Sequence, residues 1–291
     1  MLIGVDWGGT HIKAAIVDGA NVRAHASADT HAATALDAIA ALVKQLAPAP
    51  AQVGVAIPGE VRDDGRCWRL PNVPGFENVN IGVQLQRRIG CPVAVENDAT
   101  AAALAERLYG WGNRYKSFLL VTLGTGVGGG LVLDGSLRRG ASGFAGEIGH
   151  VLVDSSTDAW PCGCGRTGCM EAYAGKAGLL RKYAEFASPL TSVKEIADIG
   201  GAAAEEAWRQ MGHALGNGLA SINNTLDLDA IVFAGGISNS LHLIERYIRK
   251  ALAERAFAPP LSQVPLLVSQ LGEHAGVIGA AHLPVIHPAQ S

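Results

Sequence analysis

Short apolar runs that end in glycine turns alternate along this chain with segments whose apolar residues recur at helical spacing. In the first 110 residues, the apolar runs predict strands at residues 2–5, 12–17, 53–57 and 93–95. The helical spacing in the same part predicts helices at residues 33–46, 81–89 and 99–108. Strands that alternate with helices in this way indicate an α/β fold.

The pattern starts again after Gly110-Trp111-Gly112-Asn113, where we place a domain boundary. Strands are predicted at residues 118–123, 127–133 and 231–234, and the first two frame a glycine turn, as at the N-terminus. Helices are predicted near residues 172–185, 192–198, 202–223 and 241–256. Two parts that open alike suggest a duplicated α/β unit with a central cleft. We therefore predict domains 1–110 and 111–274, and we expect segment 275–291 to join the first domain.

Composition excludes several classes of protein. The chain carries 23 basic and 26 acidic residues without long runs of either sign, so neither nucleic acid nor an anionic membrane is an expected partner. No apolar run approaches the roughly 20 residues that a membrane span needs. A polar glycine turn follows the first five residues, which argues against a signal peptide. Cys67 and Cys91 are expected to be buried thiols in a reducing compartment, so we predict a cytoplasmic protein.

Three cysteines lie within eight residues, as Cys162-x-Cys164-x4-Cys169, and His150 precedes them in the run GEIGH. Thiolates and a neutral imidazole in a set of four are typical of a closed tetrahedral zinc site. Disulfides are the alternative, and the odd number of thiols argues against them. Glu147 and Glu171 flank the same segment, so a zinc ion there would hold two acidic residues beside the predicted cleft.

Two glycine turns between strands indicate phosphate binding. In Asp6-x-Gly8-Gly9-Thr10, backbone N–H groups can hold phosphate oxygens and the carboxylate can serve Mg²⁺, although an ordinary hairpin turn is an equal alternative. The second turn lies in residues 123–130, where Thr125 and Gly126 can approach a terminal phosphate. Gly235-Gly236 follows a buried strand and could support a flat base, but glycine after a strand is weak evidence.

The segment Glu96-Asn97-Asp98 joins a predicted strand to a predicted helix. Asp98 fits the position of an N-cap, which would be a purely structural role. Strand ends in α/β sheets also line ligand sites, where Asp98 could accept a hydroxyl proton and Asn97 could bind a polyol. His150 could offer its second ring nitrogen to a substrate. Asn72, between two prolines, is an ordinary turn former that could also contribute.

Together these segments resemble the ROK family of sugar kinases, within the two-lobed actin-like/hexokinase ATPase fold, over nearly the whole chain. DWGGTHIK and LGTGVGGG look like its phosphate motifs, AGGIS its adenosine motif, END its base motif, and GEIGH with CGCGRTGCME its signature. The resemblance implies that Asp98 is the general base. It implies the following further roles: sugar binding by Asn72, Asn97, Asp98, Glu147, His150 and Glu171; magnesium at Asp6; phosphates at Gly8, Gly9, Thr10, Thr125 and Gly126; adenosine at Gly235 and Gly236; zinc at His150, Cys162, Cys164 and Cys169.

The expected activity is therefore transfer of the terminal phosphoryl group of ATP to the 6-hydroxyl of a hexose, and glucose is the expected substrate. N-acetylmannosamine, N-acetylglucosamine, mannose and fructose are the alternatives within the family. A sugar-responsive repressor or a non-catalytic sugar sensor is the alternative from another class. The net negative charge, the early glycine turn and the presence of Asp98 argue against it. A homodimer is expected by analogy with the family alone.

Overall fold

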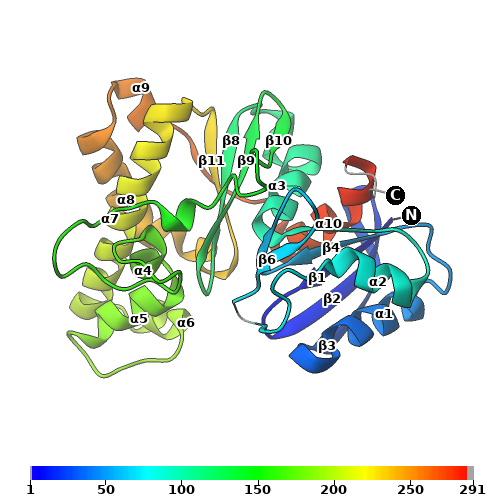
Figure 1. Cartoon of the computed structure of the whole chain (residues 1–291). Coiled ribbons are helices and arrows are strands. Elements are labelled where there is room, and N and C mark those ends of the chain that lie inside the picture. The colour runs from blue at the N-terminus through cyan, green and yellow to red at the C-terminus, as the bar shows by residue number, and fades with distance from the viewer. Residues whose placement is uncertain (1, 72, 287–291) are drawn as a thin grey trace. The chain divides into compact units, whose positions relative to one another are not determined.

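The computed structural model describes residues 2–71 and 73–286, which form two compact units. Unit 1 takes its described residues from Met1–Lys116, Gly130–Gly146 and Gln270–Ser291, and unit 2 consists of Ser117–Gly129 and Glu147–Ser269. Figure 1 labels many of the helices and strands of both units. The domains 1–110 and 111–274 stay a prediction.

Unit 1 is built on a five-stranded sheet with the strand order β3-β2-β1-β4-β7. Its elements are β1 (Leu2–Trp7), β2 (His11–Asp18), β3 (Asn21–Asp29), α1 (Ala35–Leu46), β4 (Val53–Ile57), β5 (Glu60–Val61), β6 (Cys67–Arg69), α2 (Ile81–Ile89), β7 (Val93–Asn97), α3 (Asp98–Tyr109), β10 (Ser136–Arg138) and α10 (Ala275–Ile286). Strands β1, β4 and β7 run parallel, whereas β2 and β3 are antiparallel to their neighbours. The carboxyl ends of the three parallel strands therefore lie at one edge of the sheet.

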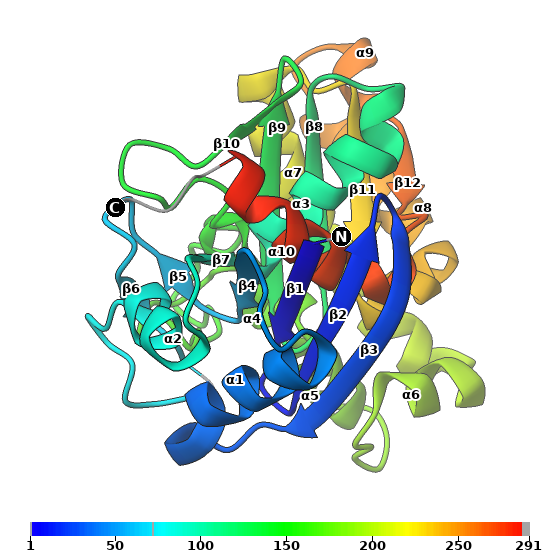
Figure 2. The same ribbon diagram turned by 90° about the vertical axis from the view of Figure 1, so that its right-hand side faces the viewer.

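Helices cover both faces of this sheet (Figure 2). Alternate side chains of the strands point to opposite faces. Val55 on β4 accordingly belongs to a core with α1 and α2, whereas its neighbour Ala56 packs against α3 and α10. The strand β4 is buried along its whole length, which explains its unbroken apolar sequence, VGVAI.

Unit 2 contains the strand order β9-β8-β11-β12, and β8, β11 and β12 run parallel. Its elements are β8 (Phe118–Leu123), β9 (Val127–Leu133, which enters unit 1 at Gly130), α4 (Met170–Ala174), α5 (Lys176–Ala184), α6 (Val193–Ile199), α7 (Gly201–Leu226), β11 (Ala230–Ala234), α8 (Leu241–Arg255), α9 (Pro259–Ser262) and β12 (Leu266–Val268). The long helix α7 packs against α4, α5 and α8. Short 3₁₀ turns in the chain lie at Ala32–Thr34, Trp111–Asn113, Ile148–His150, Gly236–Ser240 and Gly272–His274.

The structure confirms the predicted strands and most of the predicted helices, and it differs from the prediction in several details. The helix predicted near 172–185 is two helices, α4 and α5, which meet at Gly175. Asp6 and Trp7 belong to strand β1 rather than to the following turn. Strand β3 was missed, because its sequence, NVRAHASAD, has small and polar residues and no fully buried position. Within the described residues, no helix is long and apolar enough to cross a membrane.

Candidate active site

The carboxyl edge of the unit 1 sheet gathers polar side chains from the ends of β1 and β7. At the end of β7, the Asn97 Oδ1 atom accepts a hydrogen bond from the Thr100 N–H at 3.0 Å, and its Nδ2 atom donates to the Gly59 carbonyl at 3.1 Å. Asn97 is therefore the N-cap of α3, and Asp98 is the first helical residue. The capping role considered for Asp98 was wrong, so its carboxylate does not serve as the cap of the helix.

Asp98 has a strongly perturbed ionisation. The pKa of its carboxyl group is raised to about 7, mainly by burial, then by the nearby charge of Asp6 and to a smaller extent by Glu60. The Ala99 N–H donates to the Asp98 Oδ1 atom at 2.7 Å and opposes the shift. A carboxylate with a pKa near neutral pH is well matched to accept a proton from a reacting group.

Asp6 lies on β1 close to the start of α10. A Cβ atom at Gly276 would lie 2.7 Å from the Asp6 Oδ2 atom, so only glycine allows this approach of helix and carboxylate. Burial raises the pKa of Asp6, and the positive charge of Lys13 opposes the shift. The following turn is closed by a hydrogen bond from the Gly8 N–H to the His11 carbonyl at 2.9 Å, and it leaves Gly9 and Thr10 exposed. A single carboxylate beside an exposed glycine turn fits a hydrated magnesium ion and phosphate oxygens.

The second glycine turn, between β8 and β9, is held by a glutamate. The Glu171 Oε2 atom accepts a hydrogen bond from the Val127 N–H at 3.0 Å. A Cβ atom at Gly126 would lie 2.2 Å from the same oxygen, so the backbone can meet this carboxylate only at glycine. The start of α5 contacts the turn as well, because the Lys176 N–H donates to the Gly124 carbonyl at 3.0 Å.

A pocket of about 550 Å³ opens beside this turn, within unit 2. It is lined by Gly124, Thr125, Lys176, Val193, Lys194, Ala197, Asp198, Gly236, Ile237, Asn239 and Ser240. Thr125 and Gly236, which the sequence placed in two separate motifs, therefore line one cavity of the size that small-molecule ligands occupy. Lys176 and the residues of α6 were not among the predicted site residues, because neither segment belongs to a recognised motif.

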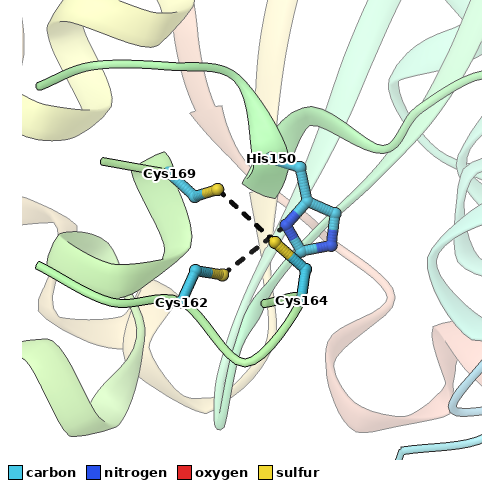
Figure 3. Close-up of side chains that lie close together, drawn as sticks. All are labelled: His150, Cys162, Cys164 and Cys169. Carbon is cyan, nitrogen blue, oxygen red and sulfur yellow. Dashed lines mark hydrogen bonds between the residues drawn. The ribbon is translucent and has the colours of Figure 1, made fainter. Parts of the chain in front are cut away.

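His150 and the three clustered cysteines point toward one another from separate segments of unit 2 (Figure 3). The Cys162 Sγ atom lies 3.8 Å from the His150 Nδ1 atom, and the Cys164 and Cys169 Sγ atoms lie 3.6 Å apart. All four donor atoms lie within 4.8 Å of one another. Cys169 is the residue before α4, and the Cys162 N–H donates to the Arg166 carbonyl at 2.8 Å, which closes the loop.

The chemistry of this donor set fits a zinc ion. Four ligands about 2.0–2.3 Å from one metal at tetrahedral angles lie roughly 3.5–3.8 Å apart, close to the two distances above. All five cysteines of the chain are free, so the disulfide alternative is excluded. Burial raises the pKa of the Cys162 thiol to about 12, which a bound dication would reverse, since coordination stabilises the thiolate. Cys67 and Cys91 are buried, as predicted.

Two glutamates lie next to the cysteine–histidine cluster. The Glu171 Oε1 atom is 3.7 Å from the Cys162 Sγ atom, so Glu171 contacts both the cluster and the glycine turn of β8 and β9. The Glu147 Oε2 atom is 3.9 Å from the His150 Nε2 atom, the ring nitrogen on the opposite side from the cysteines. Asn72, the remaining predicted residue, lies outside the described residues.

Comparisons with known proteins agree with this arrangement. The model of the ROK family matches residues 2–285. The chain is 32% identical to a glucokinase of Streptomyces coelicolor over 97% of both chains, and 33% identical to an N-acetylmannosamine kinase of Shigella boydii over 97% of both. The chain belongs to the ROK family.

A solved structure extends the similarity to the fold. A ROK family glucokinase from Streptomyces griseus, in complex with glucose and AMPPNP, superimposes with a TM-score of 0.83 and 32% identity and covers 97% of this chain and 98% of its own. The α/β fold is therefore the actin-like/hexokinase fold that the sequence predicted.

Proposed function

We propose that the protein is an ATP-dependent hexokinase that transfers the terminal phosphoryl group of ATP to the 6-hydroxyl of glucose. The observation that carries this proposal is Asp98, whose carboxylate lies at the carboxyl ends of the parallel strands and has a pKa raised to about 7. Membership of the ROK family over residues 2–285 supports it. The similarity to glucokinases over 97% of the chain favours glucose among the hexoses.

Asp98 has the role of general base in this proposal. Its carboxylate accepts the proton of the attacking hydroxyl, and a base of modest strength suffices because the transition state of phosphoryl transfer is loose. The Ala99 N–H fixes one carboxylate oxygen, and the second remains for the substrate. Asn97, already held by Thr100 and Gly59, has one further amide hydrogen for a sugar hydroxyl.

ATP would occupy the pocket of unit 2. Gly235 and Gly236 would lie against the adenosine, while Thr125 and Gly126, together with Gly8, Gly9 and Thr10 of unit 1, would bind phosphate oxygens. Asp6 would hold Mg²⁺, which neutralises charge on the phosphates. Lys176 begins α5 on the wall of the same pocket, where its ammonium group would add a positive charge for the phosphates.

The sugar would be bound by Asn97, Asp98, Glu147, His150 and Glu171, with Asn72 as a further candidate. A site that requires several hydroxyl hydrogen bonds discriminates strongly against a sugar that lacks one of them. We propose that His150, Cys162, Cys164 and Cys169 hold a structural zinc ion, which fixes the positions of His150 and Glu171. An ATP substrate is consistent with the cytoplasmic location expected from the sequence, and a homodimer stays a prediction from the family.

Release of ADP by the purified protein tests the proposal. We expect ATP- and magnesium-dependent turnover that is fastest with glucose in a panel with mannose, fructose, N-acetylmannosamine and N-acetylglucosamine. A preference for an N-acetylated sugar would show that this sugar, and not glucose, is the substrate. Sugar binding without turnover would indicate a sensor, and absence of both would contradict the proposal. Polyphosphate in place of ATP tests the phosphoryl donor, and elemental analysis of the same preparation should find one zinc ion per chain.

A further inference from the structure

Glu60 lies in the first strand after the end of β4, beside residues of the proposed sugar site. Its neighbour Gly59 accepts the hydrogen bond from the Asn97 Nδ2 atom. The residue is only 8% exposed, although a glutamate is rarely buried without a partner for its charge. Its position after Pro58-Gly59 at a strand end is one at which α/β sheets carry ligand residues.

The two oxygens of the Glu60 carboxylate have different surroundings. The Oε1 atom accepts a hydrogen bond from the Arg69 Nη2 atom at 3.1 Å. The Oε2 atom is buried and has no hydrogen-bond partner among the described residues. A buried acceptor that lacks a partner costs about 1–3 kcal/mol, and more when it is charged. Such an atom in a folded protein requires an explanation, and a ligand that supplies the missing donor is one.

The Glu60 carboxylate also lies within electrostatic reach of the proposed general base, since its charge contributes to the raised pKa of Asp98. A hydrogen-bond donor that satisfies Glu60 would therefore lie in the neighbourhood of the reacting hydroxyl. Because a carboxylate only accepts hydrogen bonds, the missing group must be a donor, either a hydroxyl or an ammonium group. Arg69 already pairs with the charge of Glu60, which favours a neutral hydroxyl over a second cation.

We infer that Glu60 is a specificity residue for the sugar: its Oε2 atom accepts a hydrogen bond from one ring hydroxyl of a neutral hexose. The inference rests on the proposed function and adds to it a residue that none of the motifs contains. The hydroxyl in question is one other than the 6-hydroxyl, which is the one that reacts with ATP.

Substitution of Glu60 by Gln, combined with a set of deoxy sugars, tests this inference. Glu60→Gln keeps the volume of the side chain and removes the charged acceptor, so kcat/KM for glucose should fall about 10- to 100-fold, the worth of a hydrogen bond to a charged group. The same variant is measured with 1-, 2-, 3- and 4-deoxyglucose. One of these sugars should be a poor substrate of the unmodified protein, and its kcat/KM should fall by at most a further factor of about two in the variant.

Glu106→Gln is the matched control. Glu106 is a fully buried glutamate of α3 whose Oε2 atom accepts a hydrogen bond from the Trp111 N–H, and it belongs to no proposed site. The variant Glu106→Gln should leave kcat/KM for every sugar unchanged within about twofold. Glu60→Asp, which keeps the charge but shortens the side chain, should recover part of the lost discrimination if the variant proteins are equally folded by circular dichroism.

Three outcomes would overturn the inference. An equal loss on glucose and on all four deoxy sugars would show that Glu60 only supports the structure, and no loss would show that it has no role. If the unmodified protein prefers glucosamine and Glu60→Gln loses this preference, the donor to Glu60 is an ammonium group and not a hydroxyl. If the unmodified protein phosphorylates no sugar, the proposed function fails, and calorimetry still decides the inference: Glu60→Gln must weaken glucose binding at least about tenfold.

Discussion

At the scale of single residues, burial opposes the charges of Asp6 and Asp98, the two carboxylates at the carboxyl edge of the unit 1 sheet. Burial raises the pKa of both, and among the described residues neither pairs with an arginine as Glu96 does with Arg139. A folded protein retains groups of this kind at functional sites, because the environment that makes them costly also tunes their chemistry. Replacement of Asp98, the proposed general base, should therefore affect catalysis and stability in opposite directions.

Asp98→Asn should abolish most of the turnover. A general base contributes about 10²- to 10⁴-fold, so kcat should fall by that factor, while the dissociation constant for glucose changes only a few-fold. Steady-state kinetics and calorimetry measure the two quantities. Asp37→Asn, at an exposed carboxylate that pairs with Arg88 at 2.8 Å, is the control and should leave both unchanged. Unaltered turnover in Asp98→Asn would remove Asp98 from the mechanism.

The same substitution should stabilise the protein, and the gain should depend on pH. The pKa of Asp98 is raised from 3.8 to about 7, so between these values the folded state binds more protons than the unfolded state and its stability falls as pH rises. Asn does not titrate. Asp98→Asn should therefore add little stability at pH 4, and its advantage should grow to at most about 4 kcal/mol near pH 8. Urea unfolding at both values measures this, and a constant difference would contradict the raised pKa.

At the scale of elements, a buried ion pair connects strand β7 to the segment after β10. The Arg139 Nε atom donates to the Glu96 Oε2 atom, and the side chain of Glu96 is only 2% exposed. The Glu96 Oε1 atom accepts a hydrogen bond from the Asn97 N–H at 2.8 Å, so the ion pair is connected directly to the residue that caps α3. Arg139 thus fixes the carboxyl end of β7, where Asn97 and Asp98 lie.

Arg139→Ala should destabilise the protein by roughly 3–5 kcal/mol, because it leaves the charge of Glu96 buried and unpaired. Glu96→Leu combined with Arg139→Met removes both charges and should restore much of the loss. Urea unfolding of the two variants measures the difference. Arg23→Ala, at an exposed arginine paired with Asp18, is the control and should change stability by less than about 1 kcal/mol. Equal stability of the single and double variants would contradict the argument.

The cysteine–histidine cluster joins elements in the same way, since it connects the turn at Ile148–His150 to the start of α4. Cys164→Ser should reduce the zinc content from one ion per chain to nearly none and lower stability by more than about 3 kcal/mol. Cys91→Ser, at a buried thiol outside the cluster, should keep its zinc. Elemental analysis and thermal unfolding measure both effects. A preparation that holds no zinc before mutation would contradict the proposal.

Elements with strong patterns could be predicted from the sequence, and elements held by tertiary contacts could not. The unbroken apolar run VGVAI predicted β4 directly, and the glycine clusters predicted the turns. By contrast, β3 lacks an apolar signal, and the break at Gly175 lies inside a continuous helical pattern. Among candidate site residues, Thr125 and Gly236 belonged to recognisable motifs. Glu60 and Lys176 did not, because their positions depend on which strands and helices pack beside them.

At the scale of the whole molecule, the residues of the proposed reaction are divided between the units. Asp6 and Asp98 belong to unit 1, whereas Thr125, Gly236 and the cysteine–histidine cluster belong to unit 2. Each unit contributes one parallel set of strands and one glycine turn between its first two strands. The proposed general base and the pocket proposed for the nucleotide therefore have separate structural supports, and ligand binding to each can be measured separately.

A nucleotide alone should slow hydrogen exchange in unit 2 at the segments that line its pocket. Helix α6 has seven residues and only one buried side chain, so its amides should exchange rapidly in the free protein. AMPPNP with Mg²⁺ should protect residues 193–198 and 236–240, because a ligand that binds only the folded state at 100 times its dissociation constant adds about 2.7 kcal/mol of stability. Magnesium alone is the control and should protect neither segment. Because β4 in unit 1 is buried without any ligand, its exchange should already be slow and should not change. Protection confined to other segments would show that the pocket is not the nucleotide site, even if the protein proves to be a kinase.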